Sequence, residues 1–181
     1  MSSAWDGAAG AAPPGAPGAG GHGIPHATAA ELGEALAGHD VVHVAAHGSH
    51  RSDSPMFSSL WLADGPVSLA DLEQLRHGAS HVVVSACEAG RSRSRGGAAL
   101  GLASGLLSLG AASVVASVCR VPDETAADLM PRYHAHLSSG LPVDEALAAA
   151  VEACDLPLAG SFVAWGSPWR RRGSATGCGG T

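Results

Sequence analysis

Three short apolar segments stand in the middle of the chain, and each is separated from the next by sequence with the spacing and caps of helices. They are Val41–Ala46 (VVHVAA), His81–Ala86 (HVVVSA) and Ala112–Val118 (ASVVASV). Strands that are buried on both faces of a parallel sheet show such apolar runs. Ser161–Trp165 (SFVAW) indicates a fourth strand. This alternation predicts an α/β fold with a mostly parallel sheet and helices on both faces.

The intervening segments supply the helices and one hairpin. Asp64–Gly65, between two strand-like stretches, is a strong hairpin signal. Ser68 and Asp71 have the spacing of a capping box. We expect Asp123 to be a helix N-cap, and Pro131 to kink or interrupt the helix that follows it. The expected helices are 27–37, 68–76, 98–109, 123–138 and 142–153.

The two ends of the chain differ in composition from the middle. Residues 1–23 are nearly all Ala, Gly and Pro, which cannot bury enough surface to offset the entropy of ordering, so we expect this segment to be disordered. Residues 173–181 resemble a flexible tail for the same reason. A chain of 181 residues fits one domain with its own core, which we assign to residues 24–172.

Charge and cysteine usage exclude several classes of partner. The formal net charge is −6 and all ten basic residues are arginines, without a broad basic face, so no nucleic-acid partner is expected. No apolar run is long enough to span a bilayer, so no membrane partner is expected. The four cysteines form no CxxC pair and the amino terminus has no signal-peptide pattern. We therefore expect a cytoplasmic protein with reduced thiols and no cofactor.

Two reactive residues follow consecutive apolar segments. His47 and Gly48 come directly after the first, and Cys87 comes after the second. Chemistry in open α/β sheets occurs beyond the carboxyl ends of the strands. If the strands are neighbours, about 4.8 Å apart, the thiol and the imidazole face each other, as an activated nucleophile requires. The N–H groups of Gly48 and Cys87 could then stabilise an oxyanion.

These residues also have structural and metal-binding interpretations. A lone cysteine or a strand-end histidine is more commonly structural than catalytic, and it is the matching positions after consecutive strands that favour catalysis. His43 and His47 are four residues apart, which on a strand separates them by about 13 Å and rejects a shared metal. His134 and His136 point to different faces of a helix, so no metal site is predicted.

Taken together, the motifs resemble the CHAT domain, a family of caspase-like peptidases related to separase and often attached to tetratricopeptide repeats. The resemblance covers about residues 24–169. It implies a caspase-like three-layer sandwich in which His47 and Cys87 form the catalytic dyad, with Gly48 at the oxyanion hole. It also implies a protein or peptide substrate and a regulatory or repeat-domain partner. The matching stretches are His43–Gly48, Ser85–Gly90, Ser113–Ser117, Val121–Asp123 and Phe162–Gly166.

The sequence departs from the family pattern in two places. Cys119 stands where the family commonly has tryptophan, which weakens the packing expected beside the site. The family domain normally begins with further strands and a helix, and here that place holds only the Ala/Gly/Pro segment. The expectation is a fragment, a reduced form of the domain, or a sheet edge supplied by a partner; an uncovered edge would favour self-association.

Glu88 and Asp123 are the candidate substrate-binding residues. Such peptidases usually read the residue before the cut with a charged pocket, and either carboxylate could select a basic side chain. The alternative is structural, since Asp123 could cap a helix and Glu88 could hold the turn after the strand.

The leading hypothesis is a cysteine endopeptidase, a hydrolase that forms an acyl-enzyme on Cys87. The alternative from another class is a catalytically inactive, caspase-like interaction scaffold, which the missing amino-terminal strands favour and the intact His47–Cys87 pair opposes. A flavodoxin-like hydrolase is a third interpretation, and it lacks a phosphate-cradling glycine loop after the first strand.

Overall fold

The computed structural model describes residues 8–10, 23–49, 59–72, 79–88 and 97–171. Its strands are β1 (Ala8–Gly10), β2 (Gly23–Pro25), β3 (Val41–Ser49), β4 (Ser59–Leu62), β5 (Gly65–Ser68), β6 (His81–Glu88), β7 (Ser113–Ser117) and β8 (Phe162–Gly166). Its helices are α1 (Ala29–Gly38), α2 (Leu69–Leu72), α3 (Gly97–Ser108), α4 (Asp123–Ser138) and α5 (Val143–Glu152), with a 3₁₀ turn at Ala159–Ser161.

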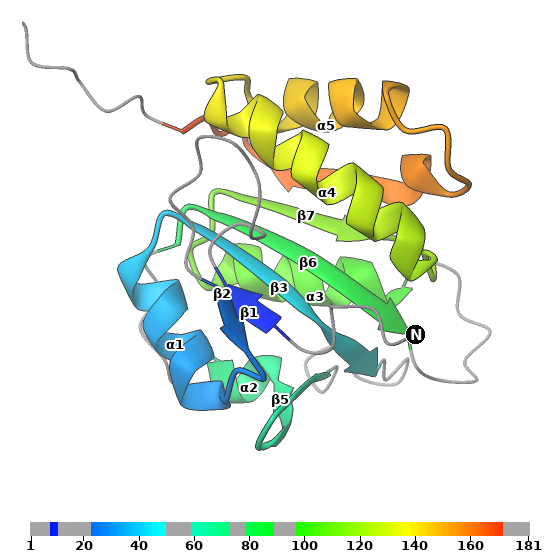
Figure 1. Cartoon of the computed structure of the whole chain (residues 1–181). Coiled ribbons are helices and arrows are strands. Elements are labelled where there is room, and N and C mark those ends of the chain that lie inside the picture. The colour runs from blue at the N-terminus through cyan, green and yellow to red at the C-terminus, as the bar shows by residue number, and fades with distance from the viewer. Residues whose placement is uncertain (1–7, 11–22, 50–58, 73–78, 89–96, 172–181) are drawn as a thin grey trace, which may run out of the picture.

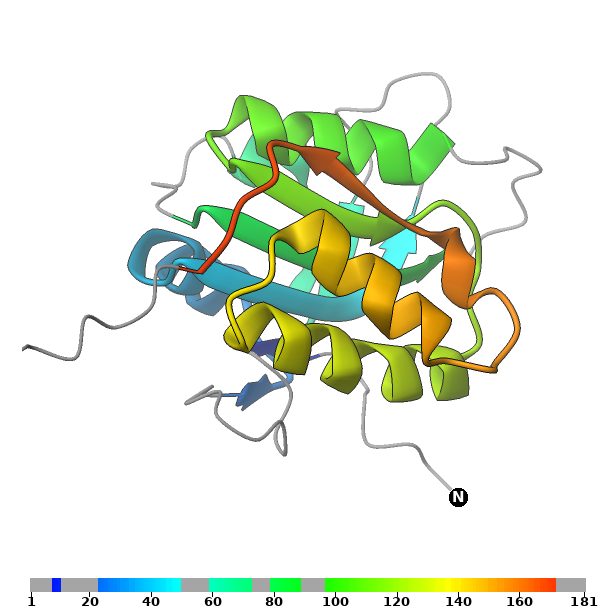
Figure 2. The same ribbon diagram turned by 90° about the horizontal axis from the view of Figure 1, so that it is seen from above.

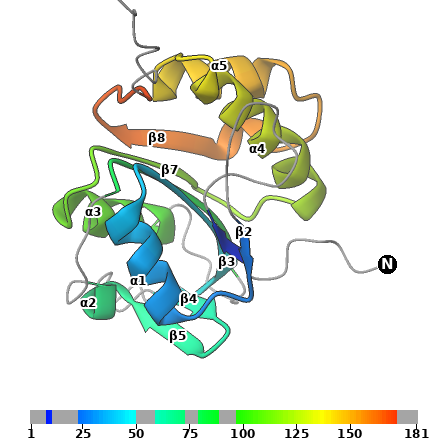
Figure 3. The same ribbon diagram turned by 60° about the vertical axis from the view of Figure 1, so that its left-hand side comes forward.

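The strands form one mixed sheet in the order β2-β1-β3-β6-β7-β8, with the β4–β5 hairpin attached to β3. The three central strands, β3, β6 and β7, run parallel, and the strands added around them pair antiparallel. α1, α2 and α3 cover one face of the sheet, and α4 and α5 cover the other (Figures 1, 2 and 3). The predicted α/β fold class, a three-layer sandwich, is confirmed.

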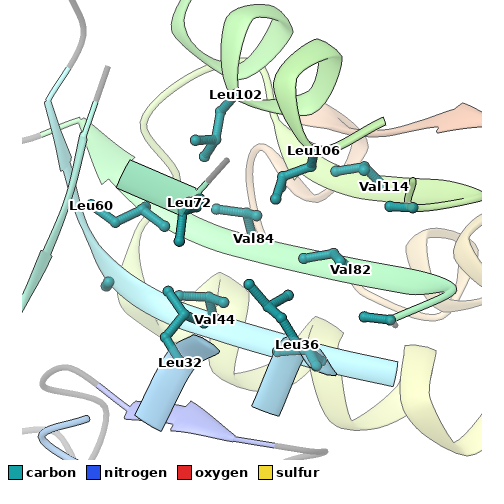
Figure 4. Packing of buried hydrophobic residues seen from close by; sticks show 14 of the residues in the cluster. Leu32, Leu36, Val44, Leu60, Leu72, Val82, Val84, Leu102, Leu106 and Val114 are labelled. Atoms are coloured by element: carbon teal, nitrogen blue, oxygen red, sulfur yellow. The ribbon is translucent and has the colours of Figure 1, made fainter. Parts of the chain in front are cut away.

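The face below α1, α2 and α3 carries an apolar core. Alternate residues of the central strands project to this side because successive strand residues point to opposite faces. Leucines of the three helices converge on the valines of β3, β6 and β7 (Figure 4). The cluster residues labelled in the close-up are Leu32, Leu36, Val44, Leu60 of β4, Leu72, Val82, Val84, Leu102, Leu106 and Val114.

The opposite face packs against α4. Val83 of β6 and Val115 of β7 are fully buried there. α4 supplies Leu129, Tyr133 and Leu137, spaced four residues apart and therefore on one side of the helix. α5 packs beside α4 and completes this second core cluster. Tyr133 is a large polar residue in an otherwise apolar row, and it introduces hydrogen bonding into this core.

β3 and β6 extend beyond the apolar runs that predicted them. β3 continues to Ser49 because residues 47–49 pair with β4 on one side, while residues 47 and 48 pair with β6 on the other. The apolar run that predicts this strand stops at Ala46. Pairing partners on both sides, rather than apolar character, hold the final residues in the sheet.

The expected N-cap of α4 is wrong, and the helix continues through Pro131. Asp123 is the first helical residue, and Pro122 occupies the N-cap position without a side-chain cap. The fixed ring of Pro122, with φ −58°, already directs the chain into the helix. Pro131 neither interrupts nor ends the helix, which continues to Ser138. Burial of the surrounding α4 side chains outweighs the local cost of the proline.

The hairpin and the capping box are confirmed. The hairpin turn lies at Ala63–Asp64, and Gly65, with φ 128°, begins β5. The backbone N–H and the hydroxyl of Ser68 donate to the Asp71 carboxylate at 2.9 and 2.6 Å, and the Asp71 N–H donates back to the Ser68 hydroxyl at 3.3 Å. The predicted end of this helix, at residue 76, lies outside the described residues, beyond Leu72.

A short strand lies within the segment whose composition predicts disorder. β1 pairs antiparallel with β3 at residues 43–45 and with β2 on its other side. Part of the sheet edge that the resemblance left open is therefore covered by this chain's own amino-terminal segment. The remaining residues up to 22, and the predicted tail at 173–181, lie outside the described residues.

Candidate functional site

The carboxyl ends of β3 and β6 lie next to each other. The two strands are direct, parallel neighbours, and their register pairs His47 with Cys87 and Gly48 with Glu88. No strand intervenes between the two positions, so the adjacency predicted for these strands is confirmed. The side chains of His47, Cys87 and Glu88 lie outside the described part of the structure, and their catalytic and binding roles stay predictions.

The other edge of β3 meets the hairpin strand β4. Here the register pairs His47 with Trp61 and Gly48 with Leu60. Leu60 is 2% exposed and belongs to the core below α1 and α2, whereas Trp61 points the other way and is 51% exposed. The position of His47 is thus flanked by that of Cys87 on one strand and by an exposed indole on the other. Sequence analysis did not identify Trp61, although a tryptophan between two leucines in a hairpin was the available signal.

Asp123 lies at the start of α4 and is exposed. β7 runs parallel to β6 and ends at Ser117, so the segment leading to α4 leaves the sheet at the edge where β3 and β6 also end (Figure 1). At β7's end the Ser117 hydroxyl donates to the Cys119 carbonyl at 2.5 Å, and Cys119 is an exposed free cysteine. Asp123 is therefore on the correct edge of the sheet for the role predicted for it.

A chain of buried hydrogen bonds lies deeper between the sheet and α4. Nε2 of His43 on β3 is 2.8 Å from the hydroxyl oxygen of Ser85 on β6. The other ring nitrogen of His43, Nδ1, is 3.0 Å from Nε2 of His134 on α4. His43 is 5% exposed and His134 is 2% exposed. The sequence pattern raised both histidines only as metal ligands and gave no sign of this contact.

A second chain of the same type joins α4 to β6 and β7. The Tyr133 hydroxyl is 2.6 Å from Nε2 of His81, and Nδ1 of His81 is 2.7 Å from the hydroxyl of Ser113. The indole of Trp169 stacks on the His81 ring, with ring centroids 5.5 Å apart and planes at 17°. Two consecutive α4 residues, Tyr133 and His134, thus each reach a histidine on a different central strand.

Burial sets the charge state of these histidines. It is the largest cause that lowers the pKa of His43 well below its ordinary value, and nearby His134 and His81 contribute. Burial, followed by the charge of Arg171, lowers the pKa of His134 to about 4. Burial is also the main cause that lowers the pKa of His81 to about 3. All three imidazoles are therefore neutral at pH 7, and each has one donor and one acceptor nitrogen.

The described residues were also compared with the requirements of a metal site and of a membrane span, and they meet neither. In that part of the chain, no three His, Cys, Asp or Glu side chains are grouped so that they could hold a metal ion. No described helix combines the length and the apolar character needed to cross a lipid bilayer.

A comparison with protein families finds a match over most of the chain. The model of the CHAT domain matches residues 23–159 of this 181-residue chain, and the matched range includes β3, β6, β7 and α4. No curated protein matches the sequence. The match covers well over half of the chain and includes both strand ends described above. The chain therefore belongs to the CHAT domain family, whose fold is caspase-like.

Proposed function

We propose that this protein is a cysteine peptidase that hydrolyses peptide bonds through a dyad of His47 and Cys87. The observation that carries the proposal is the register of β3 and β6, which pairs these two positions at the carboxyl ends of neighbouring parallel strands. Directly paired residues of adjacent strands share one face of a sheet. A thiol and an imidazole on one face at this spacing can come within hydrogen-bonding reach.

The proposed mechanism follows from that pairing. His47 accepts the thiol proton, and the Cys87 thiolate attacks the substrate carbonyl. We assign the N–H groups of Gly48 and Cys87 to the oxyanion of the tetrahedral intermediate. The imidazolium of His47 then donates its proton to the leaving amine as the C–N bond breaks. A water molecule, deprotonated by His47, hydrolyses the resulting thioester and frees Cys87.

The substrate would bind along the same edge of the sheet. Glu88 follows Cys87 directly, and Asp123 is exposed at the start of α4 on that edge. We assign both carboxylates to recognition of a basic residue before the cleaved bond. Asp123 also stabilises the positive end of the α4 helix dipole, a structural role that is compatible with this one.

Cleavage of a protein-derived peptide library tests the proposal. We expect fragments from the wild-type chain, assayed together with the products of its genomic neighbours, and none from Cys87→Ala. Cys119→Ala is the matched control, because Cys119 is an exposed free cysteine that follows the end of β7. Its fragments should equal those of the wild type. Cleavage that persists in Cys87→Ala, or no cleavage by any variant with the neighbours present, would contradict the peptidase assignment.

An interaction scaffold without catalysis is the second candidate. The observation that favours it is the reduced sheet edge, where β1 and β2 are three residues each. Such a scaffold would bind a repeat-domain or regulatory partner equally well with Cys87 replaced, and would leave that partner uncut. Binding measured with wild type and Cys87→Ala, followed by mass analysis of the partner, separates the two functions.

A further inference from the structure

A side-chain hydrogen bond also joins the two strands of the proposed dyad, just before the paired positions 47 and 87. In the register, Ala45 pairs with Ser85 and His47 pairs with Cys87. His43 lies two positions before Ala45, so it is a diagonal neighbour of Ser85, within reach of a long side chain. The 2.8 Å contact between His43 Nε2 and Ser85 Oγ bridges β3 and β6 at that point.

The bridge continues into α4. His43 has one ring nitrogen on Ser85 and the other on His134. A neutral imidazole donates from one nitrogen and accepts at the other. If His134 donates to Nδ1 of His43, then Nε2 of His43 donates to Ser85; if His134 accepts from Nδ1, then Nε2 accepts from Ser85. The protonation of His134 Nε2 therefore fixes the tautomer of His43, and the two hydrogen bonds fix the orientation of its ring. Helix and both strands form one hydrogen-bonded unit.

Burying these polar side chains costs more free energy than burying apolar side chains at the same positions would. Polar groups taken out of water cost free energy unless each finds a partner, and valine fills the equivalent positions of this sheet, as at Val83 and Val115. Polar groups that are fully satisfied instead fix one arrangement of the elements that carry them. Here the fixed elements are the two strands that end in His47 and Cys87.

We propose that Ser85 and His43 are positioning residues of the dyad. Their hydrogen bond holds β6 against β3, and so sets the separation of the Cys87 thiol and the His47 imidazole, while His134 fixes the orientation of His43. This inference rests on the proposed function. A thiol and an imidazole act as a pair only within hydrogen-bonding reach, so a small relative shift of the strand ends weakens them.

The chain contains a matched control for this role. Tyr133 bonds to His81 at the opposite, amino-terminal end of β6, six residues and about 20 Å from Cys87. Ser85→Ala and Tyr133→Phe each remove one hydroxyl from a hydrogen bond to a buried histidine. Both should lower stability, but only the first touches the strand pair just before the dyad. Ser85→Thr keeps the hydroxyl and serves as the rescue variant.

The experiment is the pH profile of Cys87 alkylation by iodoacetamide, followed on the Cys87 peptide by mass spectrometry. We expect Ser85→Ala to raise the apparent pKa of the thiol by about one unit, and thus to slow alkylation below that pKa roughly tenfold. Tyr133→Phe should leave the profile at the wild-type position, and Ser85→Thr should restore it. Circular dichroism at each pH verifies that every variant is folded.

The same profile measured on His47→Ala distinguishes failure of the positioning role from failure of the dyad. If His47→Ala shifts the profile while Ser85→Ala does not, the dyad stands and the positioning role is refuted. If Ser85→Ala and Tyr133→Phe shift the profile equally, the effect is general loosening and the positioning role is likewise refuted. If wild type and His47→Ala have the same profile, there is no dyad and both proposals are overturned.

Discussion

Two residues near the candidate site have unusual exposure: Trp61 is half exposed to solvent, whereas His43 is buried. Trp61 is an aromatic residue that keeps half of its surface in water, on the strand beside the position of His47. His43 is a titratable residue buried between the sheet and α4. An exposed aromatic beside a candidate site favours ligand contact, and a satisfied buried histidine favours rigidity. Neither property follows from the residue type alone.

Trp61→Ala should weaken the binding of substrates that carry an apolar residue near the cut. Loss of one aromatic contact, worth about 0.5–1.5 kcal/mol, raises KM roughly two- to tenfold. The value of kcat should be unchanged, because the contact is the same in ground state and transition state. Steady-state kinetics on any peptide found in the library assay measures this.

The control for Trp61 is Val163→Ala, which removes another exposed apolar side chain from β8, at the far edge of the sheet. Val163→Ala should leave KM at the wild-type value. Equal KM values for Trp61→Ala and wild type would exclude the indole from the substrate site.

Most helices and strands of the fold can be predicted from local sequence patterns. The central strands, the hairpin and the Ser68–Asp71 capping box follow from local patterns, because alternation, turn chemistry and capping act over a few residues. β1 was missed because Ala and Gly have no strand pattern, and its pairing with β3 is a tertiary contact. The His43–Ser85–His134 chain was missed for a related reason. It joins residues 42 and 91 positions apart, and only the assembled layers bring them together.

Thr28→Ala should destabilise the fold through α1. Thr28 is the N-cap of that helix and forms a capping box with Glu31, in which the Glu31 N–H donates to the threonine hydroxyl at 3.3 Å. Loss of such a cap costs about 1 kcal/mol. Urea denaturation should show a lower midpoint with an unchanged m-value. Thr28→Ser keeps the capping oxygen and should unfold at the wild-type midpoint; a midpoint as low as that of Thr28→Ala would refute the cap.

At the scale of the whole molecule, the two faces of the sheet differ in chemistry. The face below α1, α2 and α3 is an apolar core. Among the described residues, the face below α4 contains the buried histidines His43, His81 and His134, together with apolar residues. The sequence predicted the layers and the strand ends, because periodicity determines which elements form. It did not predict which face would contain buried polar groups, since that depends on how α4 lies across the strands.

Stability should fall in acid because of these histidines. Each has a pKa in the folded state below the ordinary value of about 6.5, so the unfolded chain binds more protons below that pH. The contribution of these histidines to the free energy of unfolding is fully present above pH 6.5. It is lost as the pH falls toward the folded-state pKa values of about 4 for His134 and about 3 for His81. Between pH 7.5 and pH 5, the lowered pKa of His134 reduces the free energy of unfolding by on the order of 2 kcal/mol.

Urea unfolding at pH 7.5 and pH 5 measures the loss. His134→Asn keeps a side chain able to hydrogen-bond to His43 but removes one titrating group, so its stability should depend less on pH than that of the wild type. Equal unfolding free energies for the wild type at the two pH values would show that these imidazoles do not resist protonation.

The most direct test of the central claim, that His47 and Cys87 act as a pair, is the apparent pKa of the Cys87 thiol with and without the imidazole. In the wild type we expect a pKa well below the ordinary thiol value of about 8.5, and in His47→Ala a return toward that value. The exposed Cys119, followed in the same samples, should be alkylated at the same rate in both proteins. A Cys87 pKa that is the same in wild type and His47→Ala would contradict the paired site.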